Sequence, residues 1–570
     1  VPYSRPEERA FTKHERPHTT LLIGGLTWKH EHLIHGSLEG LGYQCQYIDT
    51  PDVRAFQLGK EYGNNGQCNP TYFTVGSLVK HLQELEEGGL SRQEILDGYV
   101  FVTAGACGPC RFGMYEAEYR LALRNSGFDG FRVLLFQQND GLNQSGLEAG
   151  LELNTEFFLG LINAFIIGDL LNDVAYQIRP FEVHEGETDR VLRECLDDMH
   201  DALRDRQSYT MNSTTHATLG RLPGLRNGVE LLGKLFVQLR GRGVTDGLQQ
   251  VIQRLCQVEV DRTRVKPIVK ITGEFWAQTT EGDGNFNMFR FLEREGAQVK
   301  VENVCTFVTY IIHQYKQKVR DALGLSESSG FRRLAAALRQ RRTLATLSLA
   351  EYLLRREWNR YRDALGGMPH ELADQYELQR LGHPFYNSRA GGGEGYMEVA
   401  KNIYYHNKAL AHMVLSLKPF GCMPSTQSDG AQSAVVNRFR DMIYLPLETS
   451  GEGEVNAHSR VQMALGEAKS KSKAEFEQVL SRTGFSLDQV REYIDAHAEL
   501  KSGVYAVPRA PGVVGEAASF VHHVAQRMGY RPEESYDEPA QIDKEQSEDD
   551  LAAARALKEL NKELVLVQQN

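Results

Sequence analysis

Short apolar runs alternate with amphipathic segments over about the first 265 residues of the chain. Four runs have the composition of buried strands: TTLLIGGL (19–26), YQCQYID (43–49), GYVFVTA (98–104) and RVLLFQQ (132–138). Helix-like sequence separates them, as in MYEAEYRLALRNSG (114–127). This alternation predicts a doubly wound parallel sheet.

A second set of strand-like runs begins near Val265. Its members are KPIVKITGEF (266–275), AQVKVEN (297–303), MVLSLKPFG (413–421) and DMIYLPLE (441–448). Long helix-like stretches cover 147–261 and 306–366. The pattern predicts an α/β fold of two doubly wound parallel-sheet lobes, with helical insertions and a cleft between the lobes. We expect the lobes to span 1–265 and 266–530, followed by an acidic peripheral tail over 531–570.

Composition narrows the class of protein. The chain has 570 residues and a net charge of −11, which disfavours a general nucleic-acid binder. The most apolar stretch, 157–171, contains Asn163 and Asp169 and is too short for a membrane span. The N-terminal residues lack a signal-peptide pattern, and the chain begins at Val1, so we expect a trimmed chain or a segment of a longer one. Eight cysteines without an export signal favour a reducing, cytoplasmic compartment.

The cysteines fall into two groups by their surroundings. Cys45, Cys195 and Cys256 lie in apolar or helical sequence and are expected to be buried and structural. The second group lies among Gly, Pro and Asn, where ligands and nucleophiles occur, and comprises Cys68, Cys107, Cys110 and Cys422. Each module places a cysteine just past the carboxyl end of a strand. Ligands collect there in open α/β sheets, so we expect the loops after 98–104 and 413–421 to face one another.

The motif Cys107-Gly-Pro-Cys110 has several interpretations. A thioredoxin-type dithiol fits the four letters, but the usual preceding Trp is missing and helical sequence follows where a hairpin is needed. Half of a zinc site lacks a second cysteine pair. Iron–sulfur ligation shared with Cys68 and Cys422 suits the softness of thiolates. Inert thiols are the remaining alternative.

Three further positions are candidate catalytic residues, each with a structural alternative. Glu274 follows a strand and could instead cap or close a loop. Glu394 lies in the run RAGGGEG (389–395), which could bind phosphate or simply precede a helix. Ser450 could line the cleft floor, or Ser450 or Asn456 could cap a helix.

Two groups of polar residues have mainly structural interpretations. His30, His32 and His35 do not share one helical face, so we expect a solvated helix start rather than a metal site. Nine arginines between Arg332 and Arg362 predict a solvated helical face with ion pairs, or alternatively a surface for CoA phosphates or an acidic partner.

Several motifs occur in an order that indicates a family. They are GNNGQCNPTYFTVG (63–76), GACGPCRFGMY (105–115), ITGEFWAQTTEGDGNFNMFRFLEREGAQV (271–299), GGEGYMEVAKN (392–402), KPFGCMPSTQSDGAQS (418–433) and LPLETSGEGEVNAHSRVQMAL (445–465). Over about 18–530 the chain resembles the 2-hydroxyacyl-CoA dehydratase / benzoyl-CoA reductase-like superfamily. It looks more closely like the cluster-bearing half of fused acyl-CoA dehydratase activase proteins and the double-cubane cluster proteins.

The resemblance implies a cofactor and its ligands. In that superfamily, loops of two α/β lobes hold an iron–sulfur cluster at a cleft. Cys68, Cys110 and Cys422 match the three family ligands, whereas Cys107 is an additional candidate and Cys305 matches none. The extra cysteine leaves open a 4Fe-4S cluster or a double cubane (8Fe-9S).

The resemblance also implies a function and partners. An ATP-dependent activase with its own 4Fe-4S cluster would supply low-potential electrons to reduce a small substrate, with an acyl-CoA among the candidates. The chain has no G-x-x-x-x-G-K-[ST] motif, so we expect it to accept electrons from that partner. Subunits of the superfamily usually pair, which implies a homodimer or a larger complex. A non-catalytic electron relay or scaffold, and a thiol–disulfide oxidoreductase using CGPC, remain alternatives.

Overall fold

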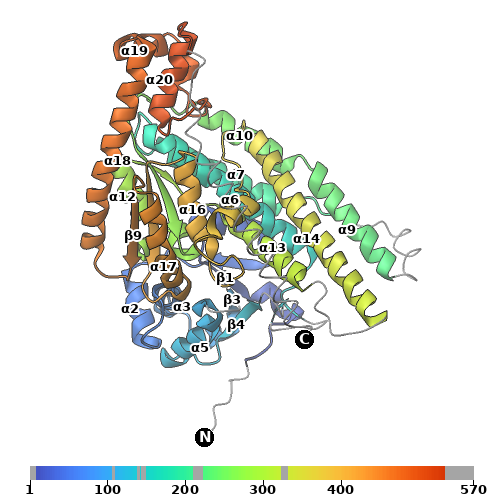
Figure 1. The fold of residues 1–570 in the computed structure, drawn as a ribbon. Coiled ribbons are helices and arrows are strands. Elements are labelled where there is room, and N and C mark those ends of the chain that lie inside the picture. Colours follow the sequence, from blue (N-terminus) through green and yellow to red (C-terminus); the bar gives the residue numbers. More distant parts are fainter. Residues whose placement is uncertain are drawn as a thin grey trace, which may run out of the picture.

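The computed structural model of the chain describes residues 8–105, 110–137, 141–142, 149–209, 223–322 and 331–532. Cys107 and most of the predicted tail lie outside the described residues. Two α/β lobes and a set of long helices make up the fold (Figure 1). The predicted α/β class with two parallel-sheet lobes is confirmed.

The N-terminal lobe contains one sheet with the strand order β2-β1-β3-β4-β5. Its first four strands pair in parallel, and the short β5 pairs antiparallel to β4. The strands are β1 (Thr20–Ile23), β2 (Gln44–Tyr47), β3 (Tyr99–Gly105), β4 (Arg132–Gln137) and β5 (Gly141–Leu142). The helices are α1 (Trp28–Glu39), α2 (Val53–Tyr62), α3 (Asn69–Glu87), α4 (Arg92–Gly98) and α5 (Tyr115–Asn125).

The C-terminal lobe repeats this topology. Its sheet is parallel throughout, in the order β7-β6-β8-β9. The strands are β6 (Ile268–Gly273), β7 (Gln298–Lys300), β8 (Met413–Pro419) and β9 (Tyr444–Thr449). The helices are α11 (Phe275–Thr279), α12 (Met288–Arg294), α15 (Gln375–Gly382), α16 (Tyr396–Asn407), α17 (Met423–Arg438), α18 (Glu454–Thr483), α19 (Leu487–Asp495) and α20 (Glu516–Arg527). All seven residues of β8 are buried, which explains the continuous apolar run in the sequence.

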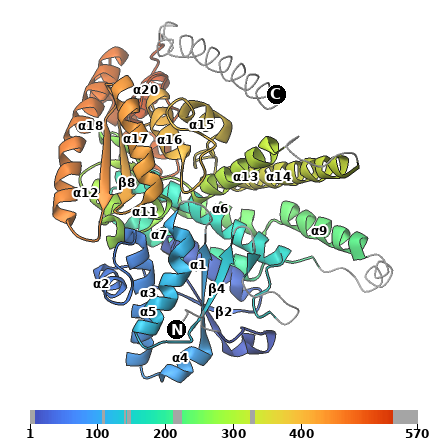
Figure 2. The ribbon, with the colours of Figure 1, turned by 60° about the horizontal axis from the view of Figure 1, so that its bottom comes forward.

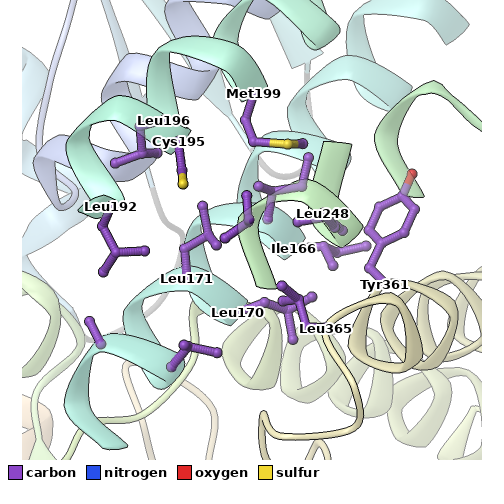
Figure 3. Close-up of a cluster of buried hydrophobic side chains, with 14 of the residues drawn as sticks. Ile166, Leu170, Leu171, Leu192, Cys195, Leu196, Met199, Leu248, Tyr361 and Leu365 are labelled. Atoms are coloured by element: carbon purple, nitrogen blue, oxygen red, sulfur yellow. The ribbon is translucent and has the colours of Figure 1, made fainter. Parts of the chain in front are cut away.

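Helices from both halves of the chain build a third core, which we call the helical module. Its members are α6 (Thr155–Ile178), α7 (Glu187–Arg204), α9 (Pro223–Arg240), α10 (Gly243–Leu255), α13 (Val304–Asp321) and α14 (Phe331–Ala364). Figure 2 shows α9 and α14 extending away from the two lobes. Side chains of α6, α7 and α14 meet in its core, among them Leu171, Cys195 and Tyr361 (Figure 3). The second half of the chain therefore completes a core begun by the first.

Helix α6 extends further than the apolar stretch seen in the sequence. Within the described residues it is the one helix long and apolar enough to cross a membrane. However, 61% of its most apolar window is buried inside the fold. Asn163 and Asp169 are also buried and bonded, to Gln238 and to the start of α13 respectively. This burial is typical of the core helix of a soluble protein.

One prediction about the cysteines is wrong. Cys195 is buried in the helical module and Cys45 is half-buried, but Cys256 is exposed. Cys256 directly follows the last residue of α10. It is one position beyond the buried Leu255 and so lies off the apolar face that packs into the core.

Candidate functional site

In both sheets, the point at which the order of the strands reverses lies at the candidate site. In each lobe the first strand is flanked by the second strand on one side and the third on the other, so the chain direction across the sheet reverses beside it. Loops that follow the strands at such a point form the usual ligand-binding crevice. Cys110 follows β3, Glu274 follows β6 and Cys422 follows β8, so three predicted site residues lie at these strand ends.

Three cysteines occupy the first positions of helical segments. Cys68, Cys110 and Cys422 are the N-cap residues of α3, of the short 3₁₀ helix Arg111–Met114, and of α17. A proline follows Cys68 and Cys422 within two residues, where its fixed backbone angle favours helix initiation. None of the three side chains caps its own helix. The thiols are therefore available for other partners.

Hydrogen bonds hold the three cysteine loops together. The amide of Asn69 donates to the carbonyl oxygen of Phe420 at 3.0 Å, which joins the loops of Cys68 and Cys422. The guanidinium of Arg111 donates to the carbonyl oxygen of Gly66 at 2.8 Å, which joins the loops of Cys110 and Cys68. The N-terminal lobe supplies two of these loops and the C-terminal lobe supplies the third, so the site spans both lobes.

Two of the three pairs of thiols interact electrostatically. Negative charge on Cys68 acts on Cys110, and charge on Cys110 acts on Cys422. Burial raises the pKa of Cys110 to about 11 and also raises the pKa values of Cys68 and Cys422. The carboxylate of Glu274 raises all three thiol pKa values further. A cation bound by the thiols would offset the free-energy cost of deprotonating them, because metal binding requires and stabilises thiolates.

Cys68 has two further hydrogen-bond partners. Its sulfur lies 3.2 Å from the hydroxyl of Thr71 and 3.1 Å from the hydroxyl of Tyr115. Neither residue was predicted from the sequence. Thr71 lies three residues after an N-cap, where a helical turn brings its side chain back to the cap, so the CNPT spacing was a usable signal. Tyr115 had no comparable signal.

Glu274 combines both roles considered for it. Its side chain accepts the amide of Ala277 at 3.0 Å and so caps α11. Its negative charge also acts on the three thiols. Burial raises the pKa of Glu274 to about 7, against the lowering effect of the amides of Ala277 and Trp276.

Glu394 lies behind Glu274 in a buried polar network. Gln278 donates to Glu394 at 2.9 Å, and the ammonium of Lys401 lies 3.6 Å from the other carboxylate oxygen. Burial raises the pKa of Glu394 to about 8, while Lys401 lowers it. The loop that carries Glu394 ends where α16 begins at Tyr396, as the structural alternative predicts.

Ser450 is engaged within its own loop, where its hydroxyl donates to the carbonyl oxygen of Glu452 at 2.7 Å. The structural alternative, that Ser450 or Asn456 caps the following helix, is wrong, because α18 begins at Glu454 with Gly453 in a left-handed conformation at the cap.

The histidine prediction is also wrong. His30 is buried and lies 3.1 Å from Asp169, while His32 and His35 are half-buried and face His200 on α7. The helix start is covered by α6 and α7 rather than by solvent. Only His30 points to a different partner, because His32 and His35 both contact the ring of His200.

The arginine-rich helix α14 fits the structural interpretation within its described side chains. Arg355 pairs with Glu351, and Arg360 with Glu357, within the helix.

Comparison of the chain with protein-family models, with curated proteins and with solved structures finds no match in any of the three. The family resemblance stays a prediction, and the site is interpreted from its own residues.

Proposed function

We propose that this chain is an iron–sulfur protein that accepts low-potential electrons and reduces a small substrate at the cysteine site. The observation that carries the proposal is that hydrogen bonds join the loops of Cys68, Cys110 and Cys422, which come from two lobes. Thiolates from distant loops are the usual ligands of such clusters.

The donor set fits the proposed cofactor. Cys68, Cys110 and Cys422 would hold the cluster, with Cys107 as a further candidate outside the described residues. A bound cluster would supply a one-electron carrier with an iron open to substrate, as a 4Fe-4S or double-cubane (8Fe-9S) unit. The hydroxyls of Thr71 and Tyr115 would tune it through hydrogen bonds to the Cys68 sulfur.

The carboxyl groups beside the thiols supply the proton chemistry of a reductase. Glu274 is half-buried and its charge acts on all three thiols, so we assign it the proton next to a bound substrate. Gln278, on the helix that Glu274 caps, donates to Glu394, which extends the polar path to Lys401. A substrate that gains electrons at the site would take its proton from Glu274.

Three exposed apolar residues lie close in the sequence to two of the site cysteines. Met114, Phe420 and Met423 are 59%, 57% and 43% exposed, and each lies within four residues of Cys110 or Cys422. Large apolar groups gathered at one place often mark protein contacts. We propose that an ATP-dependent activase with its own 4Fe-4S cluster docks here, in a cytoplasmic homodimer or larger complex.

The function is tested on protein purified without oxygen and reduced with titanium(III) citrate. We expect a paramagnetic signal after the excess reductant is removed, and we expect an acyl-CoA thioester to abolish it. A signal that persists with acyl-CoA thioesters would contradict the reductase proposal and favour an electron relay. A protein that gives no signal and holds a titratable disulfide at Cys110 would contradict the cluster itself.

Glu274→Gln separates proton supply from cluster binding. The amide oxygen still accepts the α11 cap hydrogen bond, so we expect the iron content and the reduced signal to be retained. We expect reoxidation by the thioester to slow by on the order of 100-fold, the usual range for losing a general acid. The matched control is Asp374→Asn, which changes the same chemistry at the cap of α15. Equal rates in the two variants would exclude the role of Glu274.

A further inference from the structure

A second cluster of ligand-type side chains lies between α1 and α7. It consists of His35 and Glu39 on α1 and His200 on α7, which we call the α1–α7 cluster. Helix α1 runs back from the carboxyl end of β1, so its last turns lie toward the opposite edge of the sheet from the cysteine loops. The cluster is therefore independent of the proposed electron-transfer site.

The donor atoms of the α1–α7 cluster converge. The Nδ1 atom of His35 lies 2.9 Å from Nε2 of His200. The Oε2 atom of Glu39 lies 3.3 Å from Nε2 of His200 and 3.8 Å from Nδ1 of His35. Ligands about 2.0–2.1 Å from a tetrahedral zinc ion are themselves separated by roughly 3.3 Å, so one ion fits among these donors.

Close helix packing fixes these donors in place. A Cβ atom at Gly36 would lie 2.5 Å from the carbonyl oxygen of His200, and one at Gly40 would lie 2.3 Å from that of Arg204. Only glycine allows this approach of the two backbones. The i, i+4 spacing of His35 and Glu39 then presents both side chains to His200.

The surroundings of His200 match those of a metal-bound imidazole. Its Nδ1 atom lies 3.2 Å from the carboxylate of Asp201, which leaves Nε2 for the cluster. A carboxylate on the outer nitrogen is the common arrangement behind histidine ligands, because it fixes the tautomer and orients the ring. The ring of His32 lies 4.8 Å from that of His200, centroid to centroid, and its Nε2 atom lies 3.1 Å from a carboxylate oxygen of Asp197.

The cluster is accessible to solvent. His35 and His200 are 22% and 11% exposed, so an ion can enter from solvent.

We propose that His35, Glu39 and His200 bind a divalent transition-metal ion of the zinc type, which joins α1 to α7. Two imidazoles and one carboxylate, with one position left open, form a donor set that zinc commonly takes. Such an ion binds the folded chain and so stabilises the packing of the helical module on the N-terminal lobe.

The proposal is tested with Co²⁺ as a spectroscopic probe on the full chain, purified without oxygen. We expect about one ion per chain with weak visible bands and no thiolate charge-transfer band, because the donors are nitrogen and oxygen. A charge-transfer band on the only bound ion would place it at cysteines and overturn the proposal.

Three variants locate the ion. We expect His35→Ala and His200→Ala to lose it, and Glu39→Gln to bind it at least about 10-fold more weakly. The control His406→Ala removes a histidine that faces a single carboxylate, Asp441 at 3.5 Å, and should bind as the unaltered chain does.

A second measurement guards against misfolded variants. Zn²⁺ should raise the thermal unfolding midpoint of the unaltered chain and of His406→Ala, but not that of Glu39→Gln, whose conservative change preserves packing. Equal Zn²⁺ stabilisation in Glu39→Gln and the unaltered chain would overturn the proposal.

Discussion

Gly421 lies where the loops of Cys68 and Cys422 touch. Its backbone has a φ of 76°, and a Cβ atom there would lie 3.3 Å from the Cα of Cys68 and 3.2 Å from the carbonyl oxygen of Gln67. A side chain at this position would therefore press directly on one ligand loop from the other. The relative placement of two proposed ligands depends on the absence of that one carbon atom.

Gly421→Ala should weaken retention of the iron cluster. We expect about a 10-fold or greater loss in cluster retention, as for other changes that displace ligands without removing them. Gly512→Ala is the matched control, because Gly512 also has a positive φ of 70° but no atom lies within 4 Å of its Cβ position. Both variants share the backbone strain, so equal iron loss in the two would contradict the contact argument.

Individual residues also show which features could be predicted from the sequence and which could not. Cys68, Cys110 and Cys422 were found from their Gly, Pro and Asn surroundings, since strand ends and helix starts have local signals. The partner of His35 lies 165 positions away on α7, and no local pattern connects them. Exposure of Cys256 likewise depends on which face of α10 packs against α7.

At the scale of elements, a buried ion-pair network ties β6, α16 and the loop after β7. The carboxylate of Glu302 lies 3.0 Å from the ammonium of Lys270 and 3.5 Å from that of Lys401. Burial acts to raise the pKa of Glu302, but the two lysines outweigh it and lower the pKa to about 2. The folded state therefore holds this carboxylate charged more strongly than the unfolded state does.

This network predicts a pH dependence of stability. Because the folded pKa is depressed, the contribution of Glu302 is present above about pH 4.5 and is lost as the pH falls toward about 2. Glu302→Gln leaves two buried lysines without their shared counter-charge and should cost about 3–5 kcal/mol in the free energy of unfolding at pH 7. Urea unfolding at several pH values should show this difference shrinking below about pH 4.

The control for this prediction is Glu467→Gln, whose side chain is 62% exposed and pairs with Lys471 one turn away. We expect it to change the unfolding free energy by less than about 0.5 kcal/mol. A pH-independent loss in Glu302→Gln would contradict the assignment of the network.

The elements themselves were largely predictable. All eight predicted strands occur, because strands buried in parallel sheets form continuous apolar runs between turn residues. The observed strand ends differ from the predicted ends by a few residues, because apolar sequence continues into the loops. The cap of α18 was missed because a glycine in a left-handed conformation begins that helix in place of a polar side chain.

At the scale of the whole molecule, the helical module joins the two halves of the chain. Trp358 of α14 is 1% exposed within a core built largely by α6, α7 and α10. Its indole also donates to the carbonyl oxygen of His370 at 3.3 Å. The sequence predicted helical insertions in each half but gave no sign that they share one core, because that association depends on tertiary packing.

Trp358→Ala should lower the free energy of unfolding by about 3–5 kcal/mol, the range for removing a large buried aromatic side chain. Leu349→Ala on the same helix is the control, because Leu349 is 53% exposed and its loss should cost less than about 0.5 kcal/mol. Denaturant unfolding of both variants measures the difference. Similar stability in the two would contradict a core shared between the halves.

The most direct test of the central claim is the iron and acid-labile sulfide content of protein purified without oxygen. We predict about four iron atoms per chain for a single cubane, or about eight for a double cubane that includes Cys107. Each of Cys68→Ser, Cys110→Ser and Cys422→Ser should lose most of this iron, whereas Cys256→Ser, at an exposed cysteine, should keep it. A chain without iron, or iron that is retained in all three variants, would contradict the account.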